Sequence, residues 1–286
     1  MPALFLFLLL LSVSEVFAGQ TLLAVRVDVP PAIDGRAKDP AWSQTLPVTV
    51  HDLVADIDIT LRAVYSGDTV YILSQFPDAT EDRLHRRLVW DAEKKGYLDG
   101  PTREDCFVLK WSMVSHETKL SLKENQPYRA DIWFWKAHRT DHSGYADDKL
   151  QIYTVARDKK AKMLISESGS VFYLIRQGDE GRPAYEPILN AAYSGDRVDK
   201  YEFKVPSGSR ADIRAKGLWN DGGWTVEFAR KLDTGNLDDV QFALAGAYPF
   251  GVSRYEIAGR DPEPDSDTPV YGTGDVGEIL TLKFKP

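Results

Sequence analysis

The chain has 286 residues, of which 43% are hydrophobic, and a formal net charge of −8. This composition is typical of a globular protein, and the negative charge argues against a nucleic-acid partner, because such partners require a basic surface. Cys106 is the only cysteine. An intrachain disulfide, a cysteine-rich zinc or iron–sulfur site, and covalent haem attachment through Cys-x-x-Cys-His are therefore excluded.

The first residues have the pattern of a secretory signal peptide. Leu4–Leu11 is an unbroken apolar run, and Val16 and Ala18 are small residues placed for cleavage after Ala18. We therefore predict a signal peptide over residues 1–18 and a mature protein in the periplasm or outside the cell. No later segment approaches the ~20 apolar residues of a membrane helix, so no membrane span is expected.

Two segments have the pattern of β-hairpins. Ile59–Phe76 alternates polar and apolar residues on both sides of Ser66-Gly67-Asp68, and Lys216–Leu232 does so around Asn220–Gly223. β-Branched and aromatic runs on either side of a glycine-containing turn predict two antiparallel strands.

Further runs of β-branched and aromatic residues predict more strands. They are Leu22–Val29, Cys106–Ser112, Lys149–Val155, Val171–Ile175, Val240–Ala245 and Ile279–Phe284. Many short strands separated by turn signals are typical of a sandwich or a barrel. We predict one all-β domain over residues 19–286, mainly an antiparallel β-sandwich with long polar loops and short helices.

Common catalytic motifs are missing from the sequence. It has no Gly-x-Ser-x-Gly elbow, His-Glu-x-x-His helix, phosphate loop or dinucleotide fingerprint. Acidic pairs occur at Glu104-Asp105 and Asp147-Asp148, and we interpret them as solvated loop charges or turn caps. Enzymatic activity is left open, since carboxylates are plentiful but none stands out as an acid/base pair.

The run DIWFWK is the most unusual short segment. If it is a strand, Ile132 and Phe134 face one side, while Asp131, Trp133 and Trp135 face the other. One face would join the core. The second tryptophan-bearing face would either fill a core as well or line the cavity of a flat aromatic ligand.

Polar residues follow the aromatic run. Lys136, His138 and Arg139 would form the rim of such a cavity, with Arg139 as a candidate partner for a haem propionate. His138 and His142 are four residues apart and would share one face of a helix, where they could hold a metal ion. Gly144 favours a loop instead, in which these histidines lie at the surface or at a pocket edge.

A non-covalent haem would also need axial ligands. Met113, at the end of the strand CFVLKWS, can project into a pocket, whereas Met163 in KKAKMLI has the pattern of a core residue. Lys216 opens the apolar segment AKGLW as a plausible half-buried lysine, although its pattern alone favours the surface. Its ordinary pKa of about 10.4 would have to fall by several units before it could bind iron.

Four segments together resemble a known family. They are AIDGRAKDPAW, ITLRAVYSGDTVYILSQFPDAT, DIWFWKAHR with GYADD, and AKGLWNDGGWTVEFARKLDTGNLDDVQFALA. In this order they resemble the ethylbenzene dehydrogenase haem-binding domain, the haem b or gamma subunit of periplasmic type II enzymes of the dimethyl sulfoxide reductase family. The resemblance covers nearly the whole mature chain, and the IDG opening is also similar to that of family-9 carbohydrate-binding modules.

The resemblance implies a sandwich like a family-9 carbohydrate-binding module, with haem b between loops at one end. It implies electron transfer between molybdenum/iron–sulfur subunits and a soluble c-type cytochrome. Among the ligands, it implies an axial lysine, which falls on Lys216, and an axial methionine about ten residues before DIWFW. That place holds Leu122 and Lys123, so Met113, His116 or His138 would have to substitute, or this member has lost haem.

Three hypotheses follow. The first is a periplasmic b-type haem protein with Lys216 and Met113 as iron ligands, Trp133 and Trp135 as pocket walls and Arg139 at a propionate. The second is a non-catalytic carbohydrate-binding module without haem, in which the two tryptophans clamp a sugar ring. Exposed tryptophans would favour this second hypothesis and buried ones would count against it. The third is a hydrolase or lyase that uses loop carboxylates.

Overall fold

The computed structural model describes residues 19–52, 56–189, 194–255 and 279–285, so the predicted signal peptide over residues 1–18 lies outside the described part. Within the described residues, three short 3-10 helices occur: η1 (Pro40–Gln44), η2 (Asp141–Ser143) and η3 (Gly208–Ala211). None of the described helices has the length and apolar character that a bilayer crossing demands.

Most strands belong to one continuous hydrogen-bonded sheet of thirteen strands. Its path is β10 (Lys162–Ile165), β11 (Val171–Gly178), β9 (Asp147–Thr154), β8 (Tyr128–Lys136), β7 (Cys106–Ser112), β17 (Ala247–Tyr255), β18 (Leu280–Lys285), β1 (Thr21–Arg26), β3 (Ile57–Ser66), β4 (Thr69–Pro77), β16 (Gly223–Lys231) and β15 (Arg214–Asn220), with β2 (Val48–Asp52) paired to β3 outside the path. β1 pairs in parallel with β18 and β3, and the other pairs are antiparallel.

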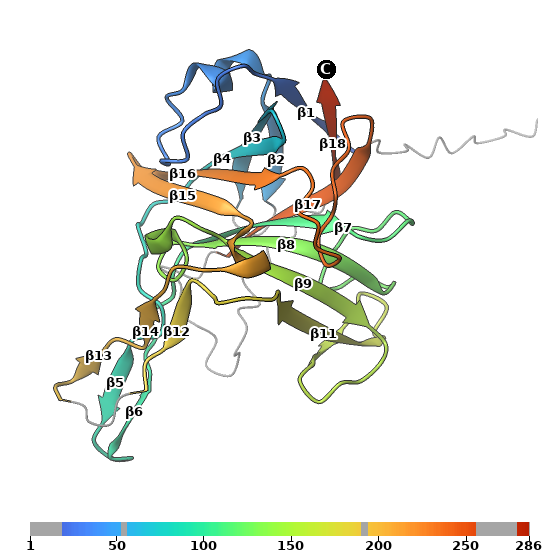
Figure 1. Ribbon diagram of the computed structural model, residues 1–286. Coiled ribbons are helices and arrows are strands. Elements are labelled where there is room, and N and C mark those ends of the chain that lie inside the picture. Colours follow the sequence, from blue (N-terminus) through green and yellow to red (C-terminus); the bar gives the residue numbers. More distant parts are fainter. Residues whose placement is uncertain (1–18, 53–55, 190–193, 256–278, 286) are drawn as a thin grey trace, which may run out of the picture.

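The sheet folds over itself into two layers. Figure 1 shows β7, β8, β9 and β11 below β1 to β4, β15 and β16. β17 and β18 continue the sheet from the lower layer, at β7, to the upper layer, at β1. The main core lies between these layers and contains aromatic residues from both, including Trp111, Trp133, Trp135, Trp224, Phe228 and Phe250. The predicted all-β sandwich with mainly antiparallel pairing is therefore confirmed.

Both predicted hairpins form. β3 and β4 close at the pair Ser66↔Thr69, and β15 and β16 close at Asn220↔Gly223. In the second turn Asp221 and Gly222 have φ values of 52° and 81°. Positive φ at both central residues matches the twist of a two-residue hairpin, which explains the Asp-Gly sequence at this position.

The strand predicted over Val240–Ala245 is wrong, because the described chain runs as a loop there. Its backbone is bound partly by buried side chains and partly by the Leu232 carbonyl, which accepts from the amide of Phe242 at 2.7 Å. The amide of Val240 donates to Asp131 Oδ2 at 2.9 Å, and its carbonyl accepts from Arg230. Side-chain partners thus satisfy the polar backbone groups that a sheet would otherwise pair.

Two small sheets form an arm beside the sandwich (Figure 1). One contains β5 (Leu88–Asp91), β6 (Gly96–Asp99) and β13 (Arg197–Val198), and the other contains β12 (Tyr185–Pro187) and β14 (Tyr201–Phe203). They arise from the long segments after β4 and after β11. Side chains of this arm contact the residues that follow β8, which makes the long loops part of the candidate site.

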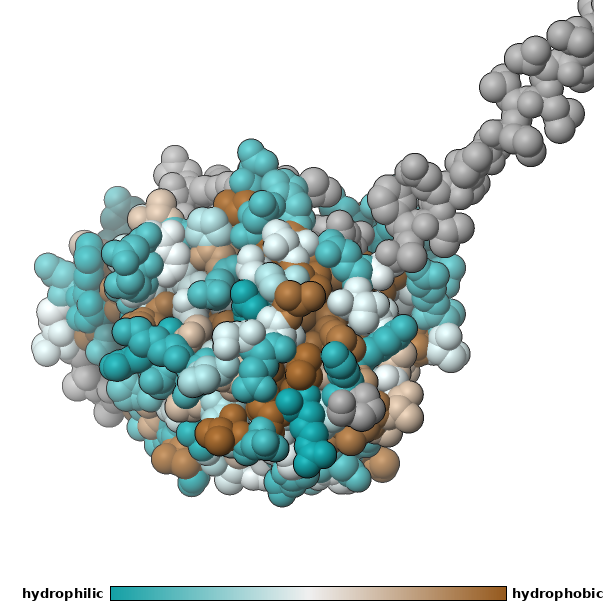
Figure 2. Space-filling model, turned by 90° about the horizontal axis from the view of Figure 1, so that it is seen from above, coloured by the Kyte–Doolittle hydropathy of each residue, from teal (hydrophilic) through white to brown (hydrophobic). Residues whose placement is uncertain are grey.

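The outer surface is mostly polar. Figure 2 looks down on the upper layer and shows hydrophilic residues with smaller hydrophobic groups between them. Leu46, at 85% exposure, is one such apolar residue. Scattered exposed apolar residues are normal on proteins in water, so they do not mark a binding site.

Candidate functional site

Lys216, the predicted lysine ligand, is bound to a buried carboxylate. Its Nζ donates to Asp141 Oδ2 and to the Asp141 carbonyl, both at 3.0 Å. Arg83 Nη1 donates to the same Oδ2 at 2.9 Å, while Trp135 Nε1 donates to Oδ1 at 2.8 Å. Asp141 is 1% exposed. Its hydrogen bonds from Trp135 and Lys216 connect the end of β8 to the edge strand β15.

The edge strand approaches β8 unusually closely at Gly217. Its amide donates to Asp141 Oδ1 at 2.6 Å, and a Cβ at this position would lie 2.2 Å from Trp135 Cζ2. Glycine is therefore required here because a larger residue would collide with the indole. The contact also shows that Trp135 is enclosed between β15 and the core.

Trp133 and Trp135 belong to the main core. Both are 0% exposed, and they pack against Trp111 and Trp224 at ring-centre distances of 5.1 Å and 4.9 Å respectively. The expected alternation of β8 holds, since Ile132 lies in a second apolar cluster on the opposite face of the sheet. The structure thus places the two predicted pocket walls inside the packed sandwich.

Met113 lies far from Lys216. The Met113 amide donates to the carbonyl of Arg129 near the start of β8, whereas Lys216 reaches Asp141 beside Trp135 near its end. Six residues of extended strand between Arg129 and Trp135 span about 20 Å. The structure therefore does not bring the two predicted iron ligands together.

The other candidate ligands are also separated from Lys216 or engaged elsewhere. Leu122 and Lys123 lie in the β7–β8 connection, at the Met113 end of β8. His116 is exposed in the same connection, and Met163 is 60% exposed on β10 rather than in the core.

His138 and His142 both pack on one aromatic ring of the arm. The ring centre of Phe203 lies 5.4 Å from that of His138 and 4.2 Å from that of His142. His142 is part of the 3-10 helix η2, whose C-cap is Gly144 in the left-handed conformation. The glycine thus ends a helix of only three residues, so the segment is a turn with one short 3-10 helix rather than the longer helix that a shared histidine face would need.

Arg139, the predicted propionate partner, is paired with an internal carboxylate. Its Nε donates to Glu104 Oε1, and the backbone amides of His138 and Arg139 donate to Glu104 Oε2 at 2.8 and 2.9 Å. Glu104 is 2% exposed. A carboxylate thus already occupies the place that a propionate would take beside Arg139.

A buried polar network continues beside Arg139. Lys136 Nζ donates to Asp147 and, at 2.9 Å, to the hydroxyl of Tyr185, while Lys149 Nζ lies 3.3 Å from Asp147 Oδ2. Burial alone would raise the pKa of Asp147, but Lys136 and then Lys149 hold it below its usual range. Asp147 is thus paired with two lysines, and the network joins β8 and β9 to the arm.

The interpretation of the acidic pairs as solvated loop charges is wrong. Glu104, Asp105, Asp147 and Asp148 are all buried, with exposures of 3% or less. Glu104, Asp105 and Asp147 accept hydrogen bonds from well-placed donors. No donor among the described residues hydrogen-bonds to either oxygen of Asp148, which sets it apart from the other three.

Sequence analysis missed the group to which Asp148 belongs. Asp131, Asp148 and Asp239 are buried and place one oxygen each within 4.8 Å of the others. Asp131 was assigned to the tryptophan-bearing face of its strand, whereas Asp239 lies just before the predicted strand Val240–Ala245 and matched no motif. Only the fold brings these three residues together.

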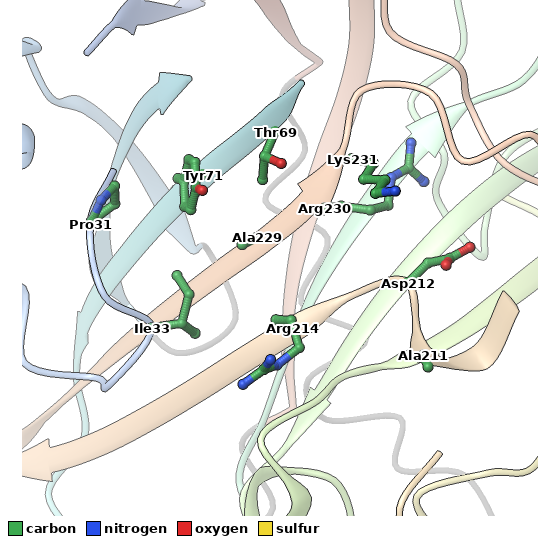
Figure 3. A pocket seen from close by; sticks show the side chains of 10 residues that line it. All are labelled: Pro31, Ile33, Thr69, Tyr71, Ala211, Asp212, Arg214, Ala229, Arg230 and Lys231. Atoms are coloured by element: carbon green, nitrogen blue, oxygen red, sulfur yellow. The ribbon is translucent and has the colours of Figure 1, made fainter. Parts of the chain in front are cut away.

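A shallow pocket lies on the other side of Arg230. It has a volume of about 460 Å³ and is lined by apolar residues such as Ile33 and Tyr71 and by the charged residues Asp212 and Arg214. Figure 3 shows that the lining side chains come from β4, β15, β16, the segment after β1 and the end of η3. The pocket includes none of the residues predicted to hold haem.

The residues predicted to hold haem do not fit that group as one set. Lys216 and Met113 lie at opposite ends of β8, Arg139 is bound to Glu104, and the two tryptophans are closed into the core. Lys216 is half-buried, with 36% of its side chain exposed, so a ligand could reach it without disturbing the core. Met113 is half-buried as well, but at the other end of β8.

Comparison with known proteins gives one family match and several structural matches. The family model for ethylbenzene dehydrogenase matches residues 27–260. A family-9 carbohydrate-binding module from Caldicellulosiruptor kristjanssonii in complex with glucose is 8% identical, with 92% of this chain and 95% of that chain covered and a TM-score of 0.40. A putative carbohydrate-binding protein from Bacteroides uniformis is 9% identical, with 94% and 100% covered and a TM-score of 0.43. No curated protein matches the chain.

Proposed function

Since this chain belongs to the ethylbenzene dehydrogenase family, we propose that it is a non-catalytic electron-transfer component that binds haem b in the periplasm. The family match over residues 27–260 carries the proposal, because this family is associated with haem b subunits of molybdenum enzymes. A bound haem would supply an iron that cycles between Fe(II) and Fe(III). The proposed partners are molybdenum/iron–sulfur subunits and a soluble c-type cytochrome.

Lys216 is the residue that we propose as an iron ligand. It lies on the edge strand β15, and its partly exposed side chain donates from Nζ to Asp141. To bind iron it would have to lose a proton and leave Asp141, whose Oδ2 would keep its hydrogen bond from Arg83. Asp141 would therefore remain paired when Lys216 moves.

Reconstitution with haem b tests the proposal. A protein that starts at Gly19 should bind one haem and give a saturable Soret band. Lys216→Ala should weaken or shift that band, whereas Lys231→Ala, an exposed lysine of the neighbouring strand, should not. No saturable band would overturn haem binding, and a band that Lys216→Ala leaves unchanged would overturn only the ligand assignment.

The sugar-binding alternative receives no support from the two tryptophans. Stacking on a sugar ring requires an exposed indole face, and Trp133 and Trp135 are both 0% exposed. The similar carbohydrate-binding structures have TM-scores of 0.43 or less. We therefore do not extend their ligands to this chain.

A further inference from the structure

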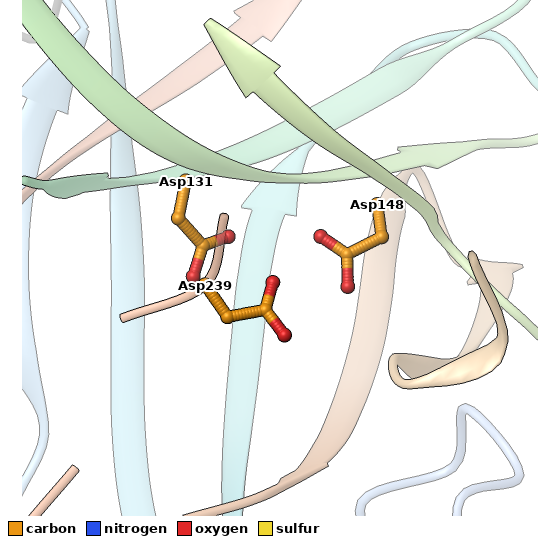
Figure 4. Close-up of side chains that lie close together, drawn as sticks. All are labelled: Asp131, Asp148 and Asp239. Carbon is orange, nitrogen blue, oxygen red and sulfur yellow. The ribbon is translucent and has the colours of Figure 1, made fainter. Parts of the chain in front are cut away.

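Three aspartates from separate parts of the chain meet between the two layers. Asp131 lies on β8 and Asp148 on β9, where Trp133 pairs with Asp148 and Asp131 pairs with Leu150. Asp131 and Asp148 are therefore diagonal neighbours on one face of the sheet. Asp239 reaches the same place from the loop after β16, and Figure 4 shows the three carboxylates pointing toward one another.

In Asp131 and Asp239, one carboxylate oxygen accepts the hydrogen bonds that hold the side chain in place. Asp131 Oδ2 accepts from Arg230 Nη1 at 2.6 Å and from the amide of Val240 at 2.9 Å, while Asp239 Oδ2 accepts from Thr234 Oγ1. The other oxygen of each, Oδ1, has no hydrogen-bond partner. Each residue is thus held in place and directs its Oδ1 into the cluster, where Asp239 Oδ1 lies 3.7 Å from Arg230 Nη1.

Asp148 provides the observation that points to a ligand. It is 1% exposed, and no donor among the described residues hydrogen-bonds to either of its carboxylate oxygens. A buried carboxylate without a partner is costly, because water no longer solvates it. The adjacent Asp179 is also buried, and its amide donates to the Asp148 carbonyl at 3.4 Å. Its carboxyl is within hydrogen-bonding reach of Asp148, but two carboxylates can pair only if one of them is protonated.

The charges in the cluster do not balance. Arg230 is fully buried and lies 2.6 Å from Asp131 and 3.7 Å from Asp239. Three ionised aspartates and this guanidinium sum to −3 + 1 = −2, and Asp179 would add a further negative charge. Burial, followed by the neighbouring Asp131, raises the pKa of Asp148 well above its usual value. The cluster therefore needs either protons or a cation.

We propose that Asp131, Asp148 and Asp239 form a binding site for one calcium ion. The oxygens offered lie within 4.8 Å of one another, and opposite oxygens around calcium are about 4.6–5.2 Å apart. All three ligand groups are hard oxygen donors, and a divalent ion neutralises the charge of −2. Magnesium fits less well, because it demands near-ideal octahedral geometry, whereas calcium accepts six to eight oxygens in a flexible geometry that water can complete.

Calcium binding would add a shared ion to three elements that already contact one another, because β8 pairs with β9 and the loop after β16 donates to Asp131. β8, β9 and the loop after β16 would share one ion, with Arg230 and Thr234 holding two of the ligand residues from outside. The role is structural, since the carboxylates are closed between the layers. The proposal does not depend on haem binding or on the electron-transfer function.

Calorimetry and thermal unfolding at pH 7.5 test the site. After dialysis against EDTA, the chain from Gly19 should bind one calcium with a saturable heat. Its Tm should rise by about 5–10 °C when calcium is 100-fold above Kd, and the same concentration of magnesium should raise it less. No saturable binding together with an unchanged Tm would overturn the proposal.

Variants separate a calcium site from a group of protonated acids. Asp148→Asn should abolish the calcium-dependent rise in Tm, while Asp28→Asn at an exposed position should retain it. If Asp148→Asn does not fold, Asp239→Asn serves in its place. Terbium emission gives a second readout, because Trp133 lies opposite Asp148 and would sensitise a bound ion. Emission that calcium cannot displace, or that Asp148→Asn retains, would contradict the assignment.

Discussion

At the scale of single residues, most of the chemistry of this chain lies in buried charges. Glu104, Asp141 and Asp147 each accept from cationic or amide donors, so their burial is compensated. Asp105 is compensated less completely. Its Oδ2 accepts from Trp224 Nε1 and the Asp82 amide, but Oδ1 has no hydrogen-bond partner.

Asp105 should make stability depend on pH. Burial and then the nearby Asp78 raise its pKa to about 7 from 3.8. The folded state therefore holds a proton that the unfolded state releases, and the stability from this group is lost as pH rises from about 4 to about 7.

Asp105→Asn should remove that loss, because an amide does not titrate and keeps an oxygen for Trp224 and Asp82. We expect the free energy of unfolding of the variant, relative to wild type, to increase by on the order of 3 kcal/mol between pH 4 and pH 7. Urea unfolding at several pH values measures this. Parallel pH profiles for the variant and the wild type would contradict the prediction, and Asp28→Asn is the control.

At the scale of elements, alternation in the sequence predicted most strands of the main sheet, but it did not predict β2, β10, β17 or the short strands of the arm. Cys106–Ser112 matches β7 residue for residue, and the other confirmed strands differ by a few residues at their ends. Val240–Ala245 failed because its apolar residues serve a loop whose backbone binds Asp131 and Arg230. The local pattern of apolar residues indicates that a segment is buried, but it does not indicate which groups hydrogen-bond to the backbone of that segment.

The contact between β15 and Trp135 should be sensitive to a single methyl group. Gly217→Ala would place a Cβ 2.2 Å from the Trp135 ring, so the edge strand or the indole would have to move. We expect a loss of about 1–3 kcal/mol in the free energy of unfolding.

Gly96→Ala is the matched control, because the nearest atom to its new Cβ would be 3.8 Å away. Chemical denaturation of both variants measures the difference. Equal stabilities would show that β15 does not hold Trp135 as closely as the structure indicates.

At the scale of the whole molecule, the two ends of the chain complete the sheet. β18 pairs in parallel with β1 and antiparallel with β17, so it joins the lower layer to the upper one. Leu280 and Leu282 of β18 are 0% exposed in the main core. The fold therefore depends on its last strand.

Deletion of residues 280–286 should prevent folding. It would leave β1 and β17 with unpaired edges and open the core between the layers. We expect the truncated chain to lack a cooperative thermal transition and the near-ultraviolet circular dichroism of packed tryptophans. A chain that starts at Gly19 keeps every described strand and should show both signals, and cooperative unfolding of the truncated chain would refute this account of β18.

The sequence by itself determined the fold class, the two hairpins and the family, because these depend on local alternation, turn residues and ordered motifs. It also showed that the two faces of β8 differ. Only the tertiary structure decided that Trp133 and Trp135 are core residues, that Met113 and Lys216 lie at opposite ends of β8, and that Asp148 is buried without a hydrogen-bond donor among the described residues. These facts depend on which distant strands become neighbours, and pairing across about 100 residues, as between Asp131 and Arg230, leaves no periodic signal in the sequence.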